Sequence, residues 1–266
     1  MKGIRFTILC ILIAVICTGC YPVGNLYQLP PPNMPLPFNP GETKLNPYLS
    51  SQGYGLQASC AIDSHFVMMV NVNGQNTQYN RWYPSNDDLS LSTTVVNFQG
   101  DIGGGYYTHL DTMVRFEILG GIGYADSYYH DISPGYIEGY NVTSVTGQFI
   151  HLLLQSDVGL VGKHAELSVG FRLSNLVAKT DYDFSYNDVT LTKQNYILDA
   201  TADALFIEPY LTFALGFKNI KLIASATESS KIFGPDISIP VPSSLYQNFN
   251  FSLGLLININ RKDIKR

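Results

Sequence analysis

Seven charged residues that could pair with one another fall on the polar side of strongly alternating segments, where Lys221 and His151 also lie. They are Asp101, Arg115, Glu117, Asp157, Glu166, Arg172 and Glu208. Carboxylates and guanidinium groups in such positions can pair with one another to fill a polar interior, or can line a polar path for solutes. We expect the first use, a structural ion-pair network, and keep a gated polar path as the functional alternative.

Arg172 and Glu208 are the two residues whose meeting can be predicted from spacing. Arg172 lies about nine residues from a tight turn at Lys163, and Glu208 lies about ten residues from a tight turn at Lys218. Their segments are joined by a long connection, so as neighbouring antiparallel strands they bring both side chains to a similar height. Asp101 can join this pair. The members expected in the opposite half of the same interior are Arg115, Glu117, Asp157 and Glu166.

The sequence offers little for covalent catalysis. The segment FRLSN at 171–175 faintly resembles the His-x-Ser-Asn segment of lipid A deacylases, but Arg172 stands where that family has histidine. Three of the five histidines fall in tight turns, and no Ser/His/Asp set converges by spacing. The cysteines show neither a CxxC motif nor the spacing of a metal site. We therefore predict that the protein is not an enzyme and that it binds no cofactor or metal.

The charged residues are carried by a chain of alternating segments. In FNFSLGLLININ, residues 249–260, the odd positions are apolar and the even positions are polar or glycine, except at Leu256. Successive side chains of a strand point to opposite faces, so this segment has one apolar and one polar face. No helical period of comparable strength is present. The same alternation recurs at 54–62, 65–73, 95–108, 112–123, 150–160, 166–174, 207–217 and 221–227.

The connections between these segments alternate in length. Tight turns are predicted at 62–65, 109–112, 162–164 and 217–220, and long polar loops at about 74–93, 126–144, 181–202 and 229–244. Short turns at one end and long loops at the other are typical of transmembrane barrels. The polar face is mostly Gly, Ser, Asn, Gln and Thr, which suits a narrow barrel interior. We therefore predict that the apolar face points outward, to lipid.

The strand count follows from the position of the chain ends. Nine segments alternate clearly, and an even number requires one more strand, for which GETKLNPYLS at 41–50 is the candidate. Pro47 weakens that strand because proline cannot donate to the ladder. We predict an all-β, up-and-down antiparallel transmembrane barrel of ten strands over residues 41–260, with eight as the alternative. A charged tail follows at 261–266.

The first residues have the pattern of an export signal. Lys2 and Arg5 precede the apolar run FTILCILIAVIC, which is too short to span a bilayer. It ends in CTGC, which resembles a bacterial lipobox. We predict a signal peptide at 1–19 and lipidation of Cys20, with ordinary signal cleavage nearby as the alternative.

The segment after Cys20 is rich in proline. Residues 21–40 hold seven of the 14 prolines and no charge, so residues 20–40 are expected to form a semi-rigid periplasmic tether. No acidic run of the kind that resembles a surface-export signal follows Cys20. We therefore expect a periplasmic N-terminus, with the lipid in the periplasmic leaflet.

Charge excludes one class of partner. The chain has 16 Lys and Arg against 21 Asp and Glu, a formal net charge of −5, so a basic face for nucleic acid is not indicated. The partners we expect are outer-membrane lipids and, through the long loops, a surface protein or glycan. We expect the protein to be a monomer.

Four stretches carry a family resemblance. They are GETKLNPYLSSQGYGLQASCAIDSHFVMMVN, GDIGGGYYTHLDTMVRFEILGGIGYADS, IEPYLTFALGFKNIKLIASA and FSLGLLININ. The chain resembles the small outer-membrane β-barrel lipoproteins of the Bacteroidota. This resemblance implies a Gram-negative outer-membrane location and supplies no catalytic residues. The function expected is a structural or surface-interaction role for a plugged, lipid-anchored barrel. A narrow pore or transporter for small solutes is the alternative, followed by a lipid-modifying enzyme.

Overall fold

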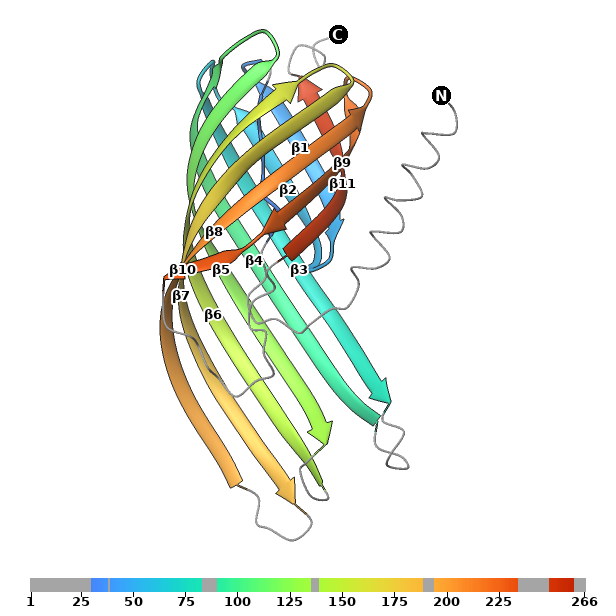
Figure 1. Cartoon of the computed structure of the whole chain (residues 1–266), viewed down its shortest axis with the longest axis vertical. Helices are drawn as coiled ribbons and strands as arrows, with labels where there is room; N and C mark the ends of the chain where they lie inside the picture. The colour runs from blue at the N-terminus through green and yellow to red at the C-terminus, as the bar shows by residue number, and fades with distance from the viewer. Residues whose placement is uncertain are drawn as a thin grey trace.

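The computed structural model describes residues 30–37, 39–82, 90–134, 139–188, 194–233 and 249–260. In this part of the chain eleven strands form one antiparallel sheet (Figure 1). The strands are β1 (Glu42–Ser50), β2 (Gly53–Ala61), β3 (Phe66–Trp82), β4 (Ser90–His109), β5 (Val114–Pro134), β6 (Gly139–Val161), β7 (Ala165–Asp188), β8 (Gln194–Gly216), β9 (Ile220–Glu228), β10 (Ser230–Phe233) and β11 (Phe249–Asn260). Across the described residues, no helix is long and apolar enough to cross a membrane.

The sheet closes on itself as a barrel of ten strands. β8 pairs with β9, β9 with β11, and β11 with β1, which completes the ring. The short β10 continues the path of β9 along β8, because Thr227 is opposite Tyr210 and Ser230 is opposite Ile207. β9 and β10 therefore share one place in the ring. The predicted ten-strand, up-and-down antiparallel barrel is confirmed, including its weak first strand at 42–50.

One end of the barrel carries the tight turns. They span 62–65, 110–113, 162–164 and 217–219, close to the predicted positions. Both terminal strands of the barrel also end here, since Glu42 is opposite Asn260. In the first turn, the backbone N–H groups of His65 and Phe66 donate to the Asp63 carboxylate and lower its pKa below the usual value. We call the end of the barrel that carries these four turns the tight-turn end.

The opposite end is formed by long strands rather than by long loops. β3 to β8 contain 17 to 24 residues, whereas β1, β2 and β9 contain nine, so one wall of the barrel extends far beyond the other (Figure 1). The loops predicted at 74–93, 126–144 and 181–202 are therefore largely wrong. The polar residues there lose the alternation but keep the backbone ladder, which needs no apolar face. We call this end of the barrel the long-strand end. Parts of the predicted loops, at 83–89, 135–138, 189–193 and 234–248, lie outside the described residues.

The two faces of the wall differ as the alternation predicted. On β4 the side chains of Phe98 and Ile102 are 57% and 55% exposed, whereas those of Gln99 and Asp101, which lie between them in the sequence, are 2% and 4% exposed. Large apolar side chains cover the outside of every long strand, and the polar side chains point into the barrel. The apolar face of β11, including Phe249 and Leu255, is likewise outward, and the exceptional Leu256 is buried inside.

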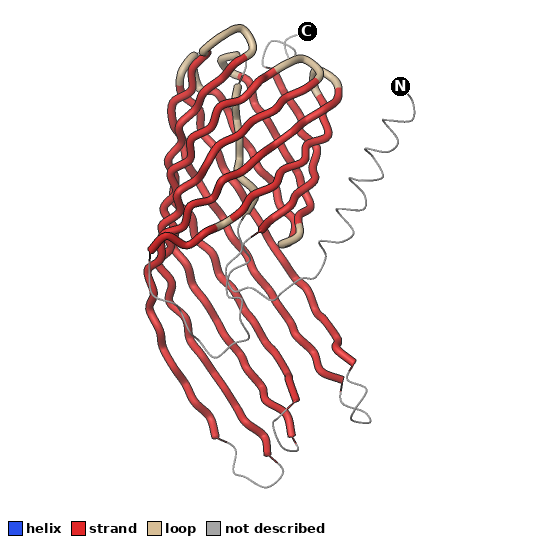
Figure 2. The backbone as a smooth tube through the Cα atoms, viewed as in Figure 1, coloured by secondary structure: helices blue, strands red, loops and turns tan. Residues whose placement is uncertain are grey.

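The N-terminal tether is the second point at which the structure differs from expectation. Residues 30–37 do not lie outside the barrel but run as an extended segment within its upper half, where all but the half-buried Met34 are buried (Figure 2). Residues 1–29, with the predicted signal peptide and Cys20, and the tail at 261–266 lie outside the described residues.

Candidate functional site in the barrel lumen

The lumen holds residues 30–37, which we call the plug. Five of its eight residues are proline, so most of its backbone has no N–H to donate and cannot pair as a strand with the wall. Its buried carbonyls still require donors, because an unpaired buried carbonyl is unfavourable. Wall side chains supply them: Arg172 Nη2 donates to Pro30 O (2.9 Å), Gln57 Nε2 to Pro31 O (2.6 Å), Gln155 Nε2 to Asn33 O (2.7 Å) and Lys44 Nζ to Leu36 O (3.2 Å).

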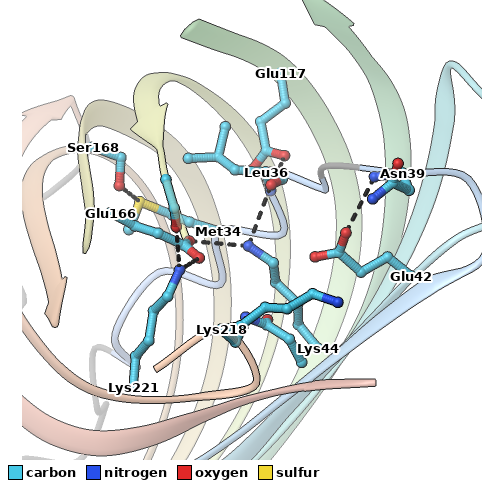
Figure 3. Close-up of polar contacts among 12 residues, drawn as sticks. Met34, Leu36, Asn39, Glu42, Lys44, Glu117, Glu166, Ser168, Lys218 and Lys221 are labelled. Atoms are coloured by element: carbon cyan, nitrogen blue, oxygen red, sulfur yellow. Dashed lines mark hydrogen bonds and ion pairs between the residues drawn. The ribbon is translucent and has the colours of Figure 1, made fainter. Parts of the chain in front are cut away.

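Leu36 is the most deeply enclosed apolar residue of the plug. Its side chain is 2% exposed and occupies space that a side chain at Gly159 would fill, since a Cβ there would lie 2.5 Å from Leu36 Cδ1. Its backbone N–H donates to Glu117 Oε2 at 2.8 Å, while Lys44 holds its carbonyl on the other side (Figure 3). The backbone N–H and the backbone carbonyl of Leu36 are therefore both paired with ionisable side chains of the wall.

Asn33 joins the plug to the opposite wall. Its side-chain amide donates to Asn71 Oδ1 at 2.8 Å and to Ala58 O at 3.2 Å. Asn71 in turn donates to Asp101 Oδ2 at 3.4 Å. The plug is thus held by β2 and β3 as well as by β5, β6 and β7.

Arg172 and Glu208 are directly opposite each other on β7 and β8. Arg172 Nε donates to Glu208 Oε2, and Ser174 Oγ donates to the same oxygen at 3.1 Å. Both charged side chains are almost completely buried. The ion pair expected from the distances to the two tight turns is present, and it also binds the plug through Arg172 and Pro30.

Glu166 lies between two lysines near the tight-turn end. Lys44 Nζ is 3.0 Å from Glu166 Oε2, and Lys221 Nζ is 2.6 Å from Oε1 (Figure 3). Lys221 also donates to Gly162 O at 2.6 Å. The sequence predicted Glu166 as a member of the network and Lys221 on the polar face, but it did not predict that Lys44 and Lys221 would pair with Glu166.

The other predicted residues bind a range of partners. Asp101 pairs with His151, and Asp157 accepts from Tyr210 Oη at 2.8 Å. Glu117 is opposite Asp157 in the register and binds the plug. Arg115 donates to the backbone carbonyls of Asp111 and Thr112 in the preceding turn and to that of Val114 at the start of β5. Hydrogen bonds through Asn33, Asn71 and Gln155 also connect Asp101 to Asp157.

The lumen also has an apolar side that the polar pattern did not predict. Buried side chains from β2 to β6 form one cluster near the tight-turn end: Ala61, Val67, Met69, Tyr107, Leu119 and Leu153. Each lies on the inward face of its strand, where single apolar residues interrupt the polar series. These interruptions are visible in the sequence, but only the closed barrel brings them together.

A pocket lies at the tight-turn mouth. It measures about 450 Å³ and is lined by residues that include Asn39, Glu42, Lys163 and Lys218. Deeper in the lumen, one cavity beside the plug measures about 10 Å³ and is lined by Asn33, Met34 and Leu256 among others. That volume holds roughly one water molecule. Within the described residues, no group of three or more His, Cys, Asp or Glu could hold a metal ion.

Comparisons with known proteins yield similarity of overall form. No family model matches the chain, and no curated protein matches it. Among solved structures, the translocator domain of the autotransporter NalP from Neisseria meningitidis is similar at 12% identity and a TM-score of 0.47, over 81% of this chain and 86% of that one. CarO from Acinetobacter baumannii is similar at 8% identity and a TM-score of 0.23, over 82% and 97%. At these values the function of neither protein transfers to this chain.

Proposed function

We propose that this protein is a Gram-negative outer-membrane β-barrel whose lumen is closed by its own N-terminal segment, with a structural or surface-interaction role. The single observation that carries the proposal is the plug. Seven of its eight residues are buried within the barrel, and wall side chains bond its carbonyls at four positions.

The membrane location is supported by the outward face of the barrel. In a water-soluble protein this face would expose large apolar side chains on strands all around the barrel, among them Phe66, Phe98, Leu154, Leu222 and Leu255. Monomeric soluble proteins rarely expose a continuous apolar belt of this kind. A closed barrel leaves no unpaired strand edge in the hydrocarbon, which is the condition for crossing a bilayer with strands.

The anchor and the partners are part of the same proposal. CTGC at 17–20 supports cleavage before Cys20 and its lipidation. The barrel begins with β1 and ends with β11 at the tight-turn end. The long-strand end lies at the opposite end of the barrel, as expected for the end that faces outward from the cell. We propose that the long hairpins at this end contact a surface protein or glycan. We propose that the protein acts as a monomer, without a cofactor and without enzymatic activity.

A narrow pore is the second candidate, favoured by the pocket at the tight-turn mouth. That pocket is lined by charged residues and leads toward the plug. Solutes could pass only if the plug left the lumen, which would break its bonds to Arg172, Gln155 and Lys44. We therefore place the resting protein in the closed state.

Two measurements test the proposed function. A closed barrel resists detergent until heated, so protein from purified outer membranes should migrate differently on a gel when boiled and unboiled. In planar bilayers the intact protein should give no steady conductance. Recovery in the soluble periplasmic fraction after Cys20→Ala, without a mobility shift, would contradict the membrane barrel. A steady open conductance would favour the pore.

A further inference from the structure

We propose that the pocket at the tight-turn mouth is a binding site for a small hydroxylated anion, a carboxylate or a phosphate. The inference goes beyond the proposed function, which assigns no ligand to this pocket. Only the compartment that supplies the ligand rests on the proposed function, because the tight-turn end of an outer-membrane barrel faces the periplasm.

The pocket has the size of a ligand site. Its volume is about 450 Å³, and small-molecule sites occupy roughly 300–1,000 Å³. Its lining comes from the segment before β1, from the β6–β7 and β8–β9 turns with the adjoining strand ends, and from the end of β11. Parts of the chain that are far apart in the sequence therefore converge on one space.

Hydrogen bonds between these parts hold the rim of the pocket in place. Gly216 N at the end of β8 donates to His164 O in the β6–β7 turn at 2.8 Å. The side chain of Asn258 donates to Lys218 O at 3.2 Å, and its backbone N–H donates to Asn219 O at 2.8 Å, which ties β11 to the β8–β9 turn. A site that is formed in advance loses less conformational entropy when a ligand binds.

The segment before β1 is held in a similar way. Asn39 N donates to Glu42 Oε2 at 3.1 Å (Figure 3), and Glu42 N donates to Asn39 O at 3.2 Å. Both backbone groups of Asn39 are therefore paired, whereas its side-chain amide has no hydrogen-bond partner among the described residues. That amide remains for a ligand.

Two further lining residues also have uncommitted side chains. Lys163 is exposed in the β6–β7 turn, and its ammonium has no hydrogen-bond or ion-pair partner in the part of the chain that the structure describes. The same holds for the side-chain amide of Asn219 in the β8–β9 turn. An ammonium group offers three N–H donors and each amide offers two. These groups suit a ligand with a negative charge and several oxygen acceptors.

The carboxylates of the pocket are already engaged by cations of the protein. Glu166 lies between Lys44 and Lys221, at 3.0 and 2.6 Å. Glu42 is buried and interacts electrostatically with Lys44 and Arg115. Neither carboxylate is therefore left to attract a cationic ligand, and the described lining favours an anion.

The site lies beside the base of the plug and not within it. Asn39 follows Leu36 by three residues, and Lys44 joins Leu36 O to Glu166 in the pocket lining. A ligand can occupy the mouth while the plug keeps its bonds to the wall. Binding therefore does not require an open lumen.

Isothermal titration calorimetry on the full-length protein tests the proposal. A polyoxyethylene detergent is suitable because it carries neither charge nor sugar. The probes are gluconate, glucose 6-phosphate, glucose and glucosamine, which have similar carbon skeletons but differ in charge. At fixed ionic strength we expect saturable binding of gluconate or glucose 6-phosphate, about ten times or more tighter than that of glucose and glucosamine, as for hydrogen bonds to a charged group. The better of the two anions distinguishes a carboxylate ligand from a phosphate ligand.

Two outcomes of this titration would overturn the proposal. One is the absence of saturable binding of either anion with a Kd below about 10 mM. The other is binding of glucose or glucosamine as tight as that of the anions, which would mean that the negative charge is not recognised.

Substitutions in the two exposed turns connect binding to the pocket. Lys163→Gln removes the uncommitted ammonium and should weaken anion binding about threefold to fivefold, the size of an exposed charge interaction. Asn219→Asp adds a negative charge to the lining and should weaken it by a similar factor. Lys179→Gln, on the outer face of β7, is the control. If the variants bind the anion as tightly as the native protein does, the anion binds elsewhere and the proposal is wrong; either variant is sufficient if the other does not fold.

The heat-dependent gel shift on the same preparations keeps this test apart from the proposed function. A gel shift without anion binding rejects the site and retains the barrel. The compartment is decided separately by Lys163→Cys in a Cys60→Ser background. If the mouth faces the periplasm, a membrane-impermeant maleimide should label this cysteine only after cells are permeabilised, and labelling on intact cells would reverse the orientation.

Discussion

His151 Nε2 lies 2.8 Å from Asp101 Oδ1, although their strands are separated by β5. Gly123 stands between them in the register, opposite Asp101 on one side and His151 on the other. A Cβ at Gly123 would lie 2.1 Å from His151 Cε1 and 2.2 Å from Asp101 Oδ1. The absence of a side chain at this position is what lets the two groups meet over an intervening strand.

Gly170 plays the same part between Asp157 and Tyr210. The three residues are consecutive in the register of β6, β7 and β8, and Tyr210 Oη donates to Asp157 Oδ2 at 2.8 Å. A Cβ at Gly170 would meet the backbone oxygen of Ser156 at 2.5 Å as well as Asp157 Cβ. The glycines inside this barrel therefore create the space in which polar side chains of next-nearest strands pair.

Gly170→Ala should destabilise the barrel by about 1–3 kcal/mol, the usual range for forcing extra atoms into a packed interior. Gly123→Ala should have a smaller effect, because it meets the movable ends of two side chains rather than backbone. The control is Gly120→Ala on the outer face, whose Cβ would come no nearer than 3.9 Å to Leu153 O. Urea unfolding in detergent micelles measures the order, and equal midpoints for Gly170→Ala and Gly120→Ala would refute the explanation.

Arg172→Ala should destabilise the protein by about 3–5 kcal/mol, since it leaves the carboxylate of Glu208 buried without its cation. It also removes the donor to Pro30 O. Lys179→Ala, an exposed cation on the same strand, provides the control. The temperature of the heat-dependent gel shift reports the difference, and a shift temperature unchanged by Arg172→Ala would mean that the lumen pair contributes nothing.

Glu166→Gln should leave the ammonium groups of Lys44 and Lys221 close together without a carboxylate between them. We expect a loss of about 3 kcal/mol in unfolding free energy, as for other broken buried pairs. Adding Lys44→Met should restore part of that loss, because one of the two cations is then absent. Glu228→Gln, at the exposed end of β9, serves as the control in the same urea titration. If the double variant is less stable than Glu166→Gln, repulsion between the lysines is not the cause.

Leu36→Asp should loosen the plug more than Leu36→Asn. Both variants lose the same buried apolar side chain, but the aspartate also places a carboxylate near Glu117, which binds the backbone N–H of residue 36. We expect conductance steps in planar bilayers with the aspartate variant, and fewer or none with the asparagine variant. If neither variant conducts while both remain folded, the wall side chains alone close the lumen.

Local alternation was sufficient to predict the barrel. Phe98 and Gln99 face opposite ways because a strand turns successive side chains by half a circle, and this holds wherever the strand lies. The turns at 62–65 and 162–164 are equally local, so strand order could be inferred from them. The pairing of Arg172 with Glu208 needed only the count of residues from two turns, since neighbouring strands stay in register over that length.

The extended parts of β3 to β8 could not be predicted from the alternation of apolar and polar residues. Toward the long-strand end, polar residues occupy successive positions, as in STT at 92–94 and HD at 130–131, so the contrast between the two faces of the strand weakens. The backbone ladder continues regardless of side-chain type, and Val142 still pairs with Ile132. The polar composition of these residues is typical of loops, so the sequence predicted loops there.

What the sequence by itself determined is the wall: strands, faces, turns and the one ion pair that lies across neighbouring strands. What only the tertiary structure decided is what fills the wall. Leu36 and Glu117 are 81 residues apart, and Pro30 and Arg172 are 142 apart. No period or spacing links such partners. A proline-rich segment looks the same in a tether as in a plug, because its missing N–H groups leave carbonyls whose donors appear only when the barrel closes around it.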